Sequence, residues 1–392
     1  MVVEHASGRR MRLDAVRAYG KIVPRRPVWS AIGWAGLVAA VLIMAFYTDV
    51  AGWVFAYVYK SAAAAVEGRT LSKDTFGALA GGTVEPLGWQ AGVLLLTTVI
   101  IAAGVSRGIE RATKVLMPLL FVLLVVCDLR SITLPRSSAG IAYLFRPDLS
   151  KLSGAMLLSA LGLAFFKLSL GMGTMTTYGS YLPDRVRIVP NAARVALADT
   201  AVSLLAGLAI FPAVFAFGGQ PAGGPGLLFA TIPLIFAQMP LGNLFTVLFF
   251  VLASVATIGA MVSLVEVPVA WLVEKGDVRR PLAAALTGGG MFALGATATL
   301  SQTPVLARVK PFGRTLFDLY DFLSSNVLLP VGGLAIAIVG GWLVSRGDFT
   351  KELDKGQAGT SRSNLFIRAF ARWVTPILIL LILLSSLGVF GT

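Results

Sequence analysis

Two charged residues inside apolar stretches are the strongest candidates for chemistry in this sequence. Lys167 lies in AFFKLSLGMG, and Asp199 opens the next apolar stretch, with Ser203 one helical turn later on the same face. A charged side chain is costly inside a lipid bilayer, so such residues usually serve binding or transport. We expect Lys167 and Asp199 to form an ion pair within the helix bundle. The alternative is that each faces water near the end of its helix.

Three further features interrupt apolar stretches. Glu266 precedes Pro268, where its carboxylate could satisfy backbone groups that the proline leaves free. Asp49 has no partner that the sequence suggests. The run Ser169–Gly173 places two glycines and a serine at the centre of a long apolar stretch, which weakens a regular helix there. A helix broken at mid-membrane exposes carbonyls and half-helix ends that can hold ions and substrate.

The composition places these residues in a membrane. Of the 392 residues, 56% are apolar and 13% are charged, about half the charge of a soluble protein. One cysteine (Cys127) and one histidine (His5) exclude an intrachain disulfide framework and a histidine- or cysteine-based transition-metal site. They also leave no pair for Ser-His-Asp catalysis, so we expect no enzyme.

Nine apolar stretches are long enough to be considered as membrane spans. They are residues 30–58, 89–105, 115–131, 156–182, 195–217, 243–273, 281–300, 322–345 and 373–390. With the N-terminus in the cytoplasm, 22 of the 33 Lys and Arg residues fall in cytoplasmic segments and 10 on the opposite side. This bias favours that orientation. It also explains the net charge of +14 without nucleic acid.

The segment 218–242 carries no charge although it lies between two spans. A stretch of this kind, rich in glycine, proline and apolar residues, indicates a re-entrant or lid element covered by protein. An interfacial loop is the alternative.

Several segments resemble the prokaryotic neurotransmitter:sodium symporter family. They are AFYTDVAGW (45–53), AFFKLSLGMGTMTTYGSYLP (164–183), LADTAVSLLAGLAIFPAVFAFG (197–218), GPGLLFATIPLIF (224–236), SLVEVPVAWLVE (263–274) and FDLYDF (317–322). The resemblance implies an all-α polytopic protein with the LeuT fold, in which two inverted repeats bind substrate at the midplane.

Compared with the family pattern, the sequence begins late. MVVEHASGRRMR is similar to the cytoplasmic end of the family's second helix, so we expect the first helix and most of the second to be missing. The single membrane domain (1–392) would then comprise 1–29 as that helix end and loop, 30–131 as the rest of repeat one, 156–345 as repeat two and 373–390 as an extra helix. Two explanations of the missing helices remain open: the start codon was assigned too late, or the chain is a shortened relative of the family.

The resemblance also implies site residues. The matching substrate-binding positions are Tyr47, Phe166, Ser169, Met172, Phe229 (the lid aromatic) and Leu264. Asp321 matches an extracellular gate acid. Without the resemblance, each of these would be taken as an ordinary packing residue.

The ion sites depart from the family pattern. Lys167 replaces a Ser or Thr that binds the first sodium, and chloride in animal members; Asp199 and Ser203 match neighbouring ligand positions. An ammonium group and Na⁺ repel each other at such distances, so we expect the ammonium to replace that sodium and pair with Asp199. At the second sodium site Ala256, Gly259 and Ala260 offer no side-chain oxygen, so we expect this site to be degenerate.

The sequence therefore predicts a secondary active transporter in the bacterial inner membrane, with a small amino-acid-like substrate, alternating access and doubtful sodium coupling. The alternative is a non-transporting scaffold or partner subunit derived from the same family. An open face could support a homo-oligomer. No cofactor other than these ions is expected.

Overall fold

Helices form the protein because, inside lipid, each backbone N–H and C=O must be satisfied within its own segment. The computed structural model describes residues 1–23, 27–219, 224–355 and 362–389, and in these ranges it contains no β-strand. The α-helices are α1 (Val2–Met11), α2 (Ala15–Ile22), α3 (Ser30–Val66), α4 (Asp74–Ala80), α5 (Val84–Ala102), α6 (Arg111–Ile132), α7 (Ser137–Phe145), α8 (Gly154–Lys167), α9 (Thr174–Tyr181), α10 (Ile188–Ala216), α11 (Ile232–Phe236), α12 (Gly242–Gly276), α13 (Arg280–Ser301), α14 (Leu316–Asp321), α15 (Leu329–Ile338), α16 (Arg346–Asp354), α17 (Arg362–Ala369) and α18 (Thr375–Ser386).

Eight continuous helical stretches of the described residues are long and apolar enough to cross a membrane. They are Ser30–Val66, Val84–Ala102, Val105–Ile132, Ile188–Ala216, Gly242–Gly276, Arg280–Ser301, Leu316–Leu343 and Asn364–Ser386. Each corresponds to one predicted span, although residue 390 of the last predicted span lies outside the described residues. The start predicted for the third span was wrong. This helix begins with a π-helical turn at Val105–Glu110, whose charged residues look like a loop in the sequence.

The fourth predicted span is the broken one. Helix α8 ends at Lys167, and α9 begins at Thr174. Between them Ser169, Gly171 and Gly173 all have positive φ angles (53°, 80° and 79°). This region of backbone space is routine for glycine and rare for other residues. The SLGMG sequence therefore breaks the helix at the predicted place.

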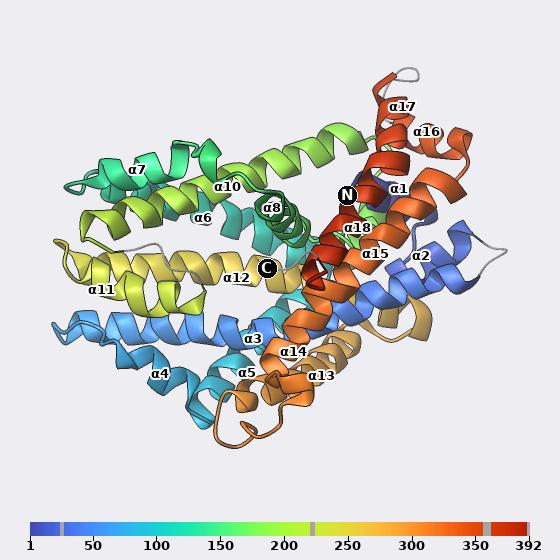
Figure 1. Ribbon diagram of the computed structural model, residues 1–392. Coiled ribbons are helices and arrows are strands. Elements are labelled where there is room, and N and C mark those ends of the chain that lie inside the picture. Colours follow the sequence, from blue (N-terminus) through green and yellow to red (C-terminus); the bar gives the residue numbers. More distant parts are fainter. Residues whose placement is uncertain (24–26, 220–223, 356–361, 390–392) are drawn as a thin grey trace.

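The two longest helices, α3 and α12, pack side by side through the middle of the molecule (Figure 1). Helices α5 and α13 cover α3 on one side, and α6, α7 and α10 pack together beyond α12. The apolar interior forms several clusters, of which the two largest meet at Phe317. The ring of Phe317 lies 5.6 Å from Phe46 in one cluster and 6.1 Å from Trp53 in the other.

Segment 218–242 folds back onto the protein, as predicted for a covered element. Outside residues 220–223, which are not described, it contains a π-helical turn at Leu227–Thr231 followed by α11. Phe229, Ile232, Ile235 and Phe236 are buried in the second apolar cluster. The absence of charge in this segment is therefore explained by burial.

Ion pairs tie several predicted cytoplasmic segments together at one end of the bundle. Helix α1 is joined to α16 through Arg9–Glu352 and Arg10–Asp348, and to the 182–187 loop through Arg12–Asp184. Helix α2 is joined to the end of α12 through Arg17–Glu274. Hydrogen bonds from Arg10 and Ser345 hold the pKa of Asp348 below its usual value.

Candidate transport site

The predicted ion pair is present beside the helix break. Lys167, the last residue of α8, places its Nζ 3.2 Å from Oδ2 of Asp199 in α10. The ammonium group also donates to the Ser203 hydroxyl, which in turn donates to the Asp199 carbonyl oxygen at 2.6 Å. About a third of each charged side chain is exposed (35% and 34%), so the cluster is accessible from one side. Three polar groups from two helices thus form one hydrogen-bonded unit at the break.

Four of the six predicted substrate residues share one apolar cluster. Met172 and Leu264 are buried within it, and Tyr47 and Phe166 pack against it. Ser169 lies in the break itself, where its N–H donates to the Phe166 carbonyl oxygen. These residues come from α3, α8, the break and α12, so the cluster joins the broken helix to the two central helices.

Phe229 lies in the other large cluster. Its ring stacks on Phe76 with centroids 5.0 Å apart and meets the edges of Trp53 and Tyr57. It is 1% exposed. The structure therefore packs this residue in an aromatic group that is separate from the cluster holding Met172 and Leu264.

Phe166 and the predicted gate acid Asp321 line the same cavity, of about 630 Å³. The cavity lies between α8, the Leu316–Leu343 span and α18. Asp321 is exposed, and its Oδ1 accepts a hydrogen bond from Ser325 at 2.8 Å. Among the ion pairs of the described residues, none involves Asp321.

The three residues of the predicted degenerate site line another cavity, of about 870 Å³, between α12 and the Val105–Ile132 span. Ala256, Gly259 and Ala260 bring no side-chain oxygen to it. Ser263, one turn further along α12, does bring a hydroxyl, which accepts a hydrogen bond from Tyr178 at 3.1 Å. The sequence analysis did not single out this pair.

With this geometry known, the chain can be compared with known proteins. The sequence model of the sodium:neurotransmitter symporter family matches residues 82–391. The chain belongs to this family. Membership makes it an integral membrane transporter, and confirms that it is not an enzyme.

Individual relatives agree with this assignment. The sodium-dependent transporter YhdH of Bacillus subtilis is 38% identical, over 99% of this chain and 86% of the relative. A sodium-dependent transporter of Haemophilus influenzae is 32% identical with the same coverage. The crystal structure of MhsT in complex with L-phenylalanine is 39% identical, covers 98% of this chain and 87% of that chain, and has a TM-score of 0.87. The predicted LeuT-type fold is thereby confirmed.

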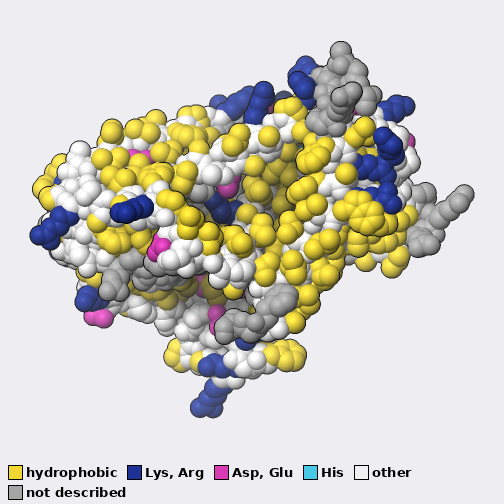
Figure 2. All heavy atoms as spheres, turned by 45° about the horizontal axis from the view of Figure 1, so that its top comes forward, with side chains coloured by type: hydrophobic (Ala, Val, Ile, Leu, Met, Phe, Trp, Pro, Cys, Tyr) yellow, Lys and Arg dark blue, Asp and Glu magenta, His cyan; other side chains and the backbone are white. Residues whose placement is uncertain are grey.

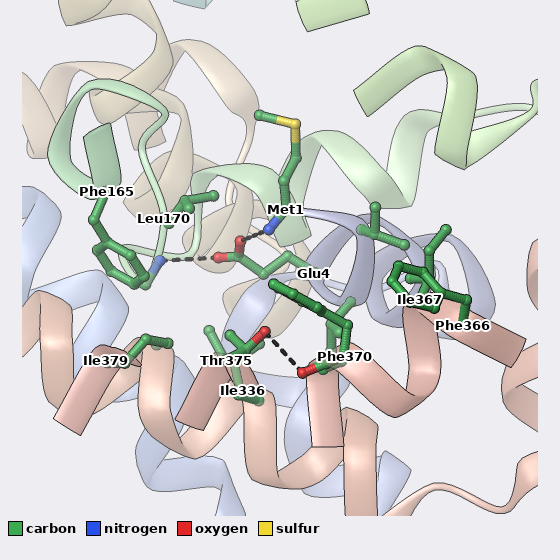
Figure 3. A pocket seen from close by; sticks show the side chains of 16 residues that line it. Met1, Glu4, Phe165, Leu170, Ile336, Phe366, Ile367, Phe370, Thr375 and Ile379 are labelled. Atoms are coloured by element: carbon green, nitrogen blue, oxygen red, sulfur yellow. Dashed lines mark hydrogen bonds and ion pairs between the residues drawn. The ribbon is translucent and has the colours of Figure 1, made fainter. Parts of the chain in front are cut away.

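In this symporter, Glu4 supports the helix break in a way that the sequence analysis missed. Its Oε1 accepts a hydrogen bond from the Gly171 N–H at 3.0 Å, and its Oε2 pairs with the Met1 amino group at 3.0 Å (Figure 3). The contacts lie at the wall of an otherwise apolar cavity of about 340 Å³ between α1, the break, α15 and the last span. The resemblance covered this stretch of the sequence, but nothing local indicated that Glu4 reaches Gly171.

The prediction for Glu266 was wrong. Glu266 does not serve the backbone around Pro268; instead it accepts a hydrogen bond from the Tyr181 hydroxyl at 2.7 Å and pairs with Arg280. Arg280 also donates to the carbonyl oxygen of Ile101 at 2.9 Å. This buried carboxylate therefore connects α9, α12, α13 and α5, and the partners were invisible because they lie in other segments.

Asp49 is fully buried in α3, and the ion pairs of the described residues do not include it. Asp128, buried in the Val105–Ile132 span, is a second carboxylate outside those ion pairs, and the sequence analysis did not single it out. A polar network lies next to Asp49 in sequence: Gln90 Nε2 donates to Thr48 Oγ1 at 2.8 Å, and Thr299 donates to Gln90 Oε1 at 3.1 Å.

We expect Asp49→Asn to leave the melting temperature unchanged or raise it. An amide of the same shape removes the cost of burying a carboxylate that has no cationic partner. Thermal unfolding of the detergent-solubilised protein measures this. Asp14→Asn is the matched control, because Asp14 is equally buried but pairs with Arg17 at 2.6 Å, so loss of this ion pair should lower the melting temperature. A clear loss for Asp49→Asn would contradict the interpretation that this carboxylate is a buried charge without compensation.

Proposed function

We propose that this chain transports a small apolar amino acid by alternating access, with the Lys167 ammonium group in place of the first sodium ion. The observation that carries the proposal is the Lys167–Asp199–Ser203 unit at the helix break. Two unit positive charges 4 Å apart repel by about 4 kcal/mol at an effective dielectric constant of 20. A sodium ion and this ammonium group would therefore compete for the same carboxylate.

Support for the substrate class comes from the apolar cluster and from the relative. Met172, Leu264, Tyr47 and Phe166 surround the break with aliphatic and aromatic surface. The structure of MhsT was obtained with L-phenylalanine. An uncharged, apolar side chain fits these surroundings, since a charged one would be left without a partner.

Further parts of the proposal concern organisation. The segments 156–345 would form the second repeat and 30–131 would belong to the first, with the charged end toward the cytoplasm. Loss of ligand oxygens at Gly259 and Ala260 would leave the second ion position without the hydroxyl groups that a hard cation prefers.

The test is uptake of radiolabelled L-phenylalanine into proteoliposomes, with sodium or potassium as the only external cation. For the native chain we expect saturable uptake that changes less than twofold between the two cations. In potassium, Lys167→Ser should reduce uptake at least tenfold relative to the native chain. In sodium, the variant should recover part of this uptake, because the serine hydroxyl and the free Asp199 carboxylate can then bind Na⁺. Unlabelled leucine should compete with the substrate, and glutamate should not.

A charge-neutral pair provides the matched control. Lys167→Met combined with Asp199→Asn should retain more substrate binding than Lys167→Met alone, because no unpaired carboxylate remains. If the native chain shows no uptake in potassium, the proposal that the Lys167 ammonium group replaces the first sodium ion is overturned. Absence of saturable uptake in both cations would favour the non-transporting scaffold.

A further inference from the structure

Three arginines and two tryptophans gather where the last two spans leave the apolar region. Arg346 begins α16, Arg368 lies in α17, and Arg372 lies in the π-helical turn Phe370–Val374 that follows. Arg368 donates to the carbonyl oxygen of Val344, two residues before Arg346, at 2.9 Å. The Arg372 guanidinium carbon lies 4.2 Å from the ring centroid of Trp342 and 5.4 Å from that of Trp373. We call these five residues the arginine–tryptophan cluster.

The arginines of this cluster are not neutralised. The ion pairs of the described residues include none of the three, and the residues outside the description contain no Asp or Glu. The carboxylates nearest in sequence are already engaged: Asp348 pairs with Arg10, Glu352 pairs with Arg9 and Lys355, and Asp354 accepts a hydrogen bond from Asn364. The arginines of α1, at the same end of the molecule, are paired with carboxylates, whereas the three arginines of the cluster are not.

Two donors of the cluster also lack an acceptor. Arg368 donates through Nη2 to the carbonyl oxygen of Val344 at 2.9 Å, but its Nη1 has no hydrogen-bond partner. The Nε of Arg372 has none either, although both atoms are buried. A buried guanidinium donor without an acceptor is costly, whereas Arg binds phosphate oxygens in a fork of two hydrogen bonds.

The surroundings are those of a membrane boundary. Trp342 and Trp373 are exposed and meet edge to face with centroids 4.8 Å apart. Tryptophan is enriched where lipid headgroups meet the hydrocarbon region. Phe366 and Ile377 of the same span are also exposed, 70% and 59%. Figure 2 shows basic side chains gathered beside apolar surface at the right of the molecule, the end that holds α15, α16 and α17.

We propose that the arginine–tryptophan cluster binds the phosphodiester headgroup of an anionic phospholipid. The headgroup phosphate supplies the negative charge that the cluster lacks, and it meets the exposed Arg346 and the half-buried Arg372. The two indole rings lie at the level of the headgroup, and the exposed apolar residues of the last span contact the acyl chains. This site is separate from the Lys167–Asp199–Ser203 unit and does not depend on the transported substrate.

The test is native mass spectrometry of the full chain in detergent, titrated with phosphatidylglycerol or with phosphatidylcholine of the same acyl chains. We expect the native chain to bind the first lipid at least tenfold more tightly. The double variant Arg346→Gln/Arg372→Gln should lose that preference while keeping the elution profile and melting temperature of the native chain. Arg368 is left in place because its bond to Val344 supports the fold.

The matched control is Arg10→Gln/Arg12→Gln, which removes the same charge from the same end but from arginines that are already paired. It should retain the preference for phosphatidylglycerol. Equal binding of the two lipids by the native chain, or the same loss in the control, would overturn the proposal. Displacement of the lipid by millimolar inorganic phosphate would also overturn it, by showing a site for free phosphate.

Discussion

Replacing Arg9 with methionine is expected to lower the free energy of unfolding by about 3–5 kcal/mol, the usual cost of breaking a buried ion pair. The Arg9 side chain is fully buried. Its Nε lies 2.6 Å from Glu352 Oε1, its Nη1 2.5 Å from the Val186 carbonyl oxygen, and its Nη2 donates to the Glu352 carbonyl oxygen. Without the guanidinium group, the buried Glu352 carboxylate keeps only Lys355 as a cationic partner, and one buried and one partly buried carbonyl oxygen lose their donor. Denaturant unfolding in detergent measures the loss.

Arg12→Met is the control for this variant, since it breaks an exposed ion pair formed by the residue that follows α1. Arg12 and Asp184 are 44% and 61% exposed, and an exposed pair contributes only about 0–1 kcal/mol. The double variant Arg9→Met/Glu352→Gln should be less destabilised than the sum of its single variants. Equal losses for Arg9→Met and Arg12→Met would contradict the interpretation.

Gly171→Ala is expected to abolish transport and to prevent most of the protein from folding. Two effects combine at this position. Its φ angle of 80° costs an L-residue roughly 1–2 kcal/mol. A methyl group would also lie well inside van der Waals contact of the Leu329 carbonyl oxygen and 3.1 Å from the Gly333 nitrogen. Both obstacles are backbone atoms, so the break and α15 would have to separate.

Two other glycines isolate these effects. Gly104 has a φ angle of 95° but open space around it, so Gly104→Ala should show the conformational cost alone. Gly289 has neither a positive φ angle nor a neighbour within 4 Å, so Gly289→Ala should be neutral. The yield of monodisperse protein and the uptake per molecule measure all three. A Gly171→Ala variant that folds and transports as well as Gly104→Ala would show that the close contact is unimportant.

Much of this site could be predicted from the sequence because charges and helix breakers are rare in apolar segments. Lys167 and Asp199 had few possible partners, and SLGMG had few possible conformations. The Arg9–Glu352 pair could not be predicted, since its members are 343 positions apart and resemble residues of a solvated loop. The same reason hid the contact of Glu4 with Gly171 and the true partners of Glu266.

The break at residues 168–173 also determines how this part of the chain enters the bilayer during synthesis. Helix α8 has 14 residues, so it is about 21 Å long, against a hydrocarbon thickness of about 30 Å. It ends in Lys167, and a lysine at the centre of an inserting helix costs about 2.5–3.5 kcal/mol. The compensating Asp199 emerges only with α10. We therefore expect α8, α9 and α10 to enter the lipid together as one hairpin, because pairing Lys167 with Asp199 offsets the cost of each charge.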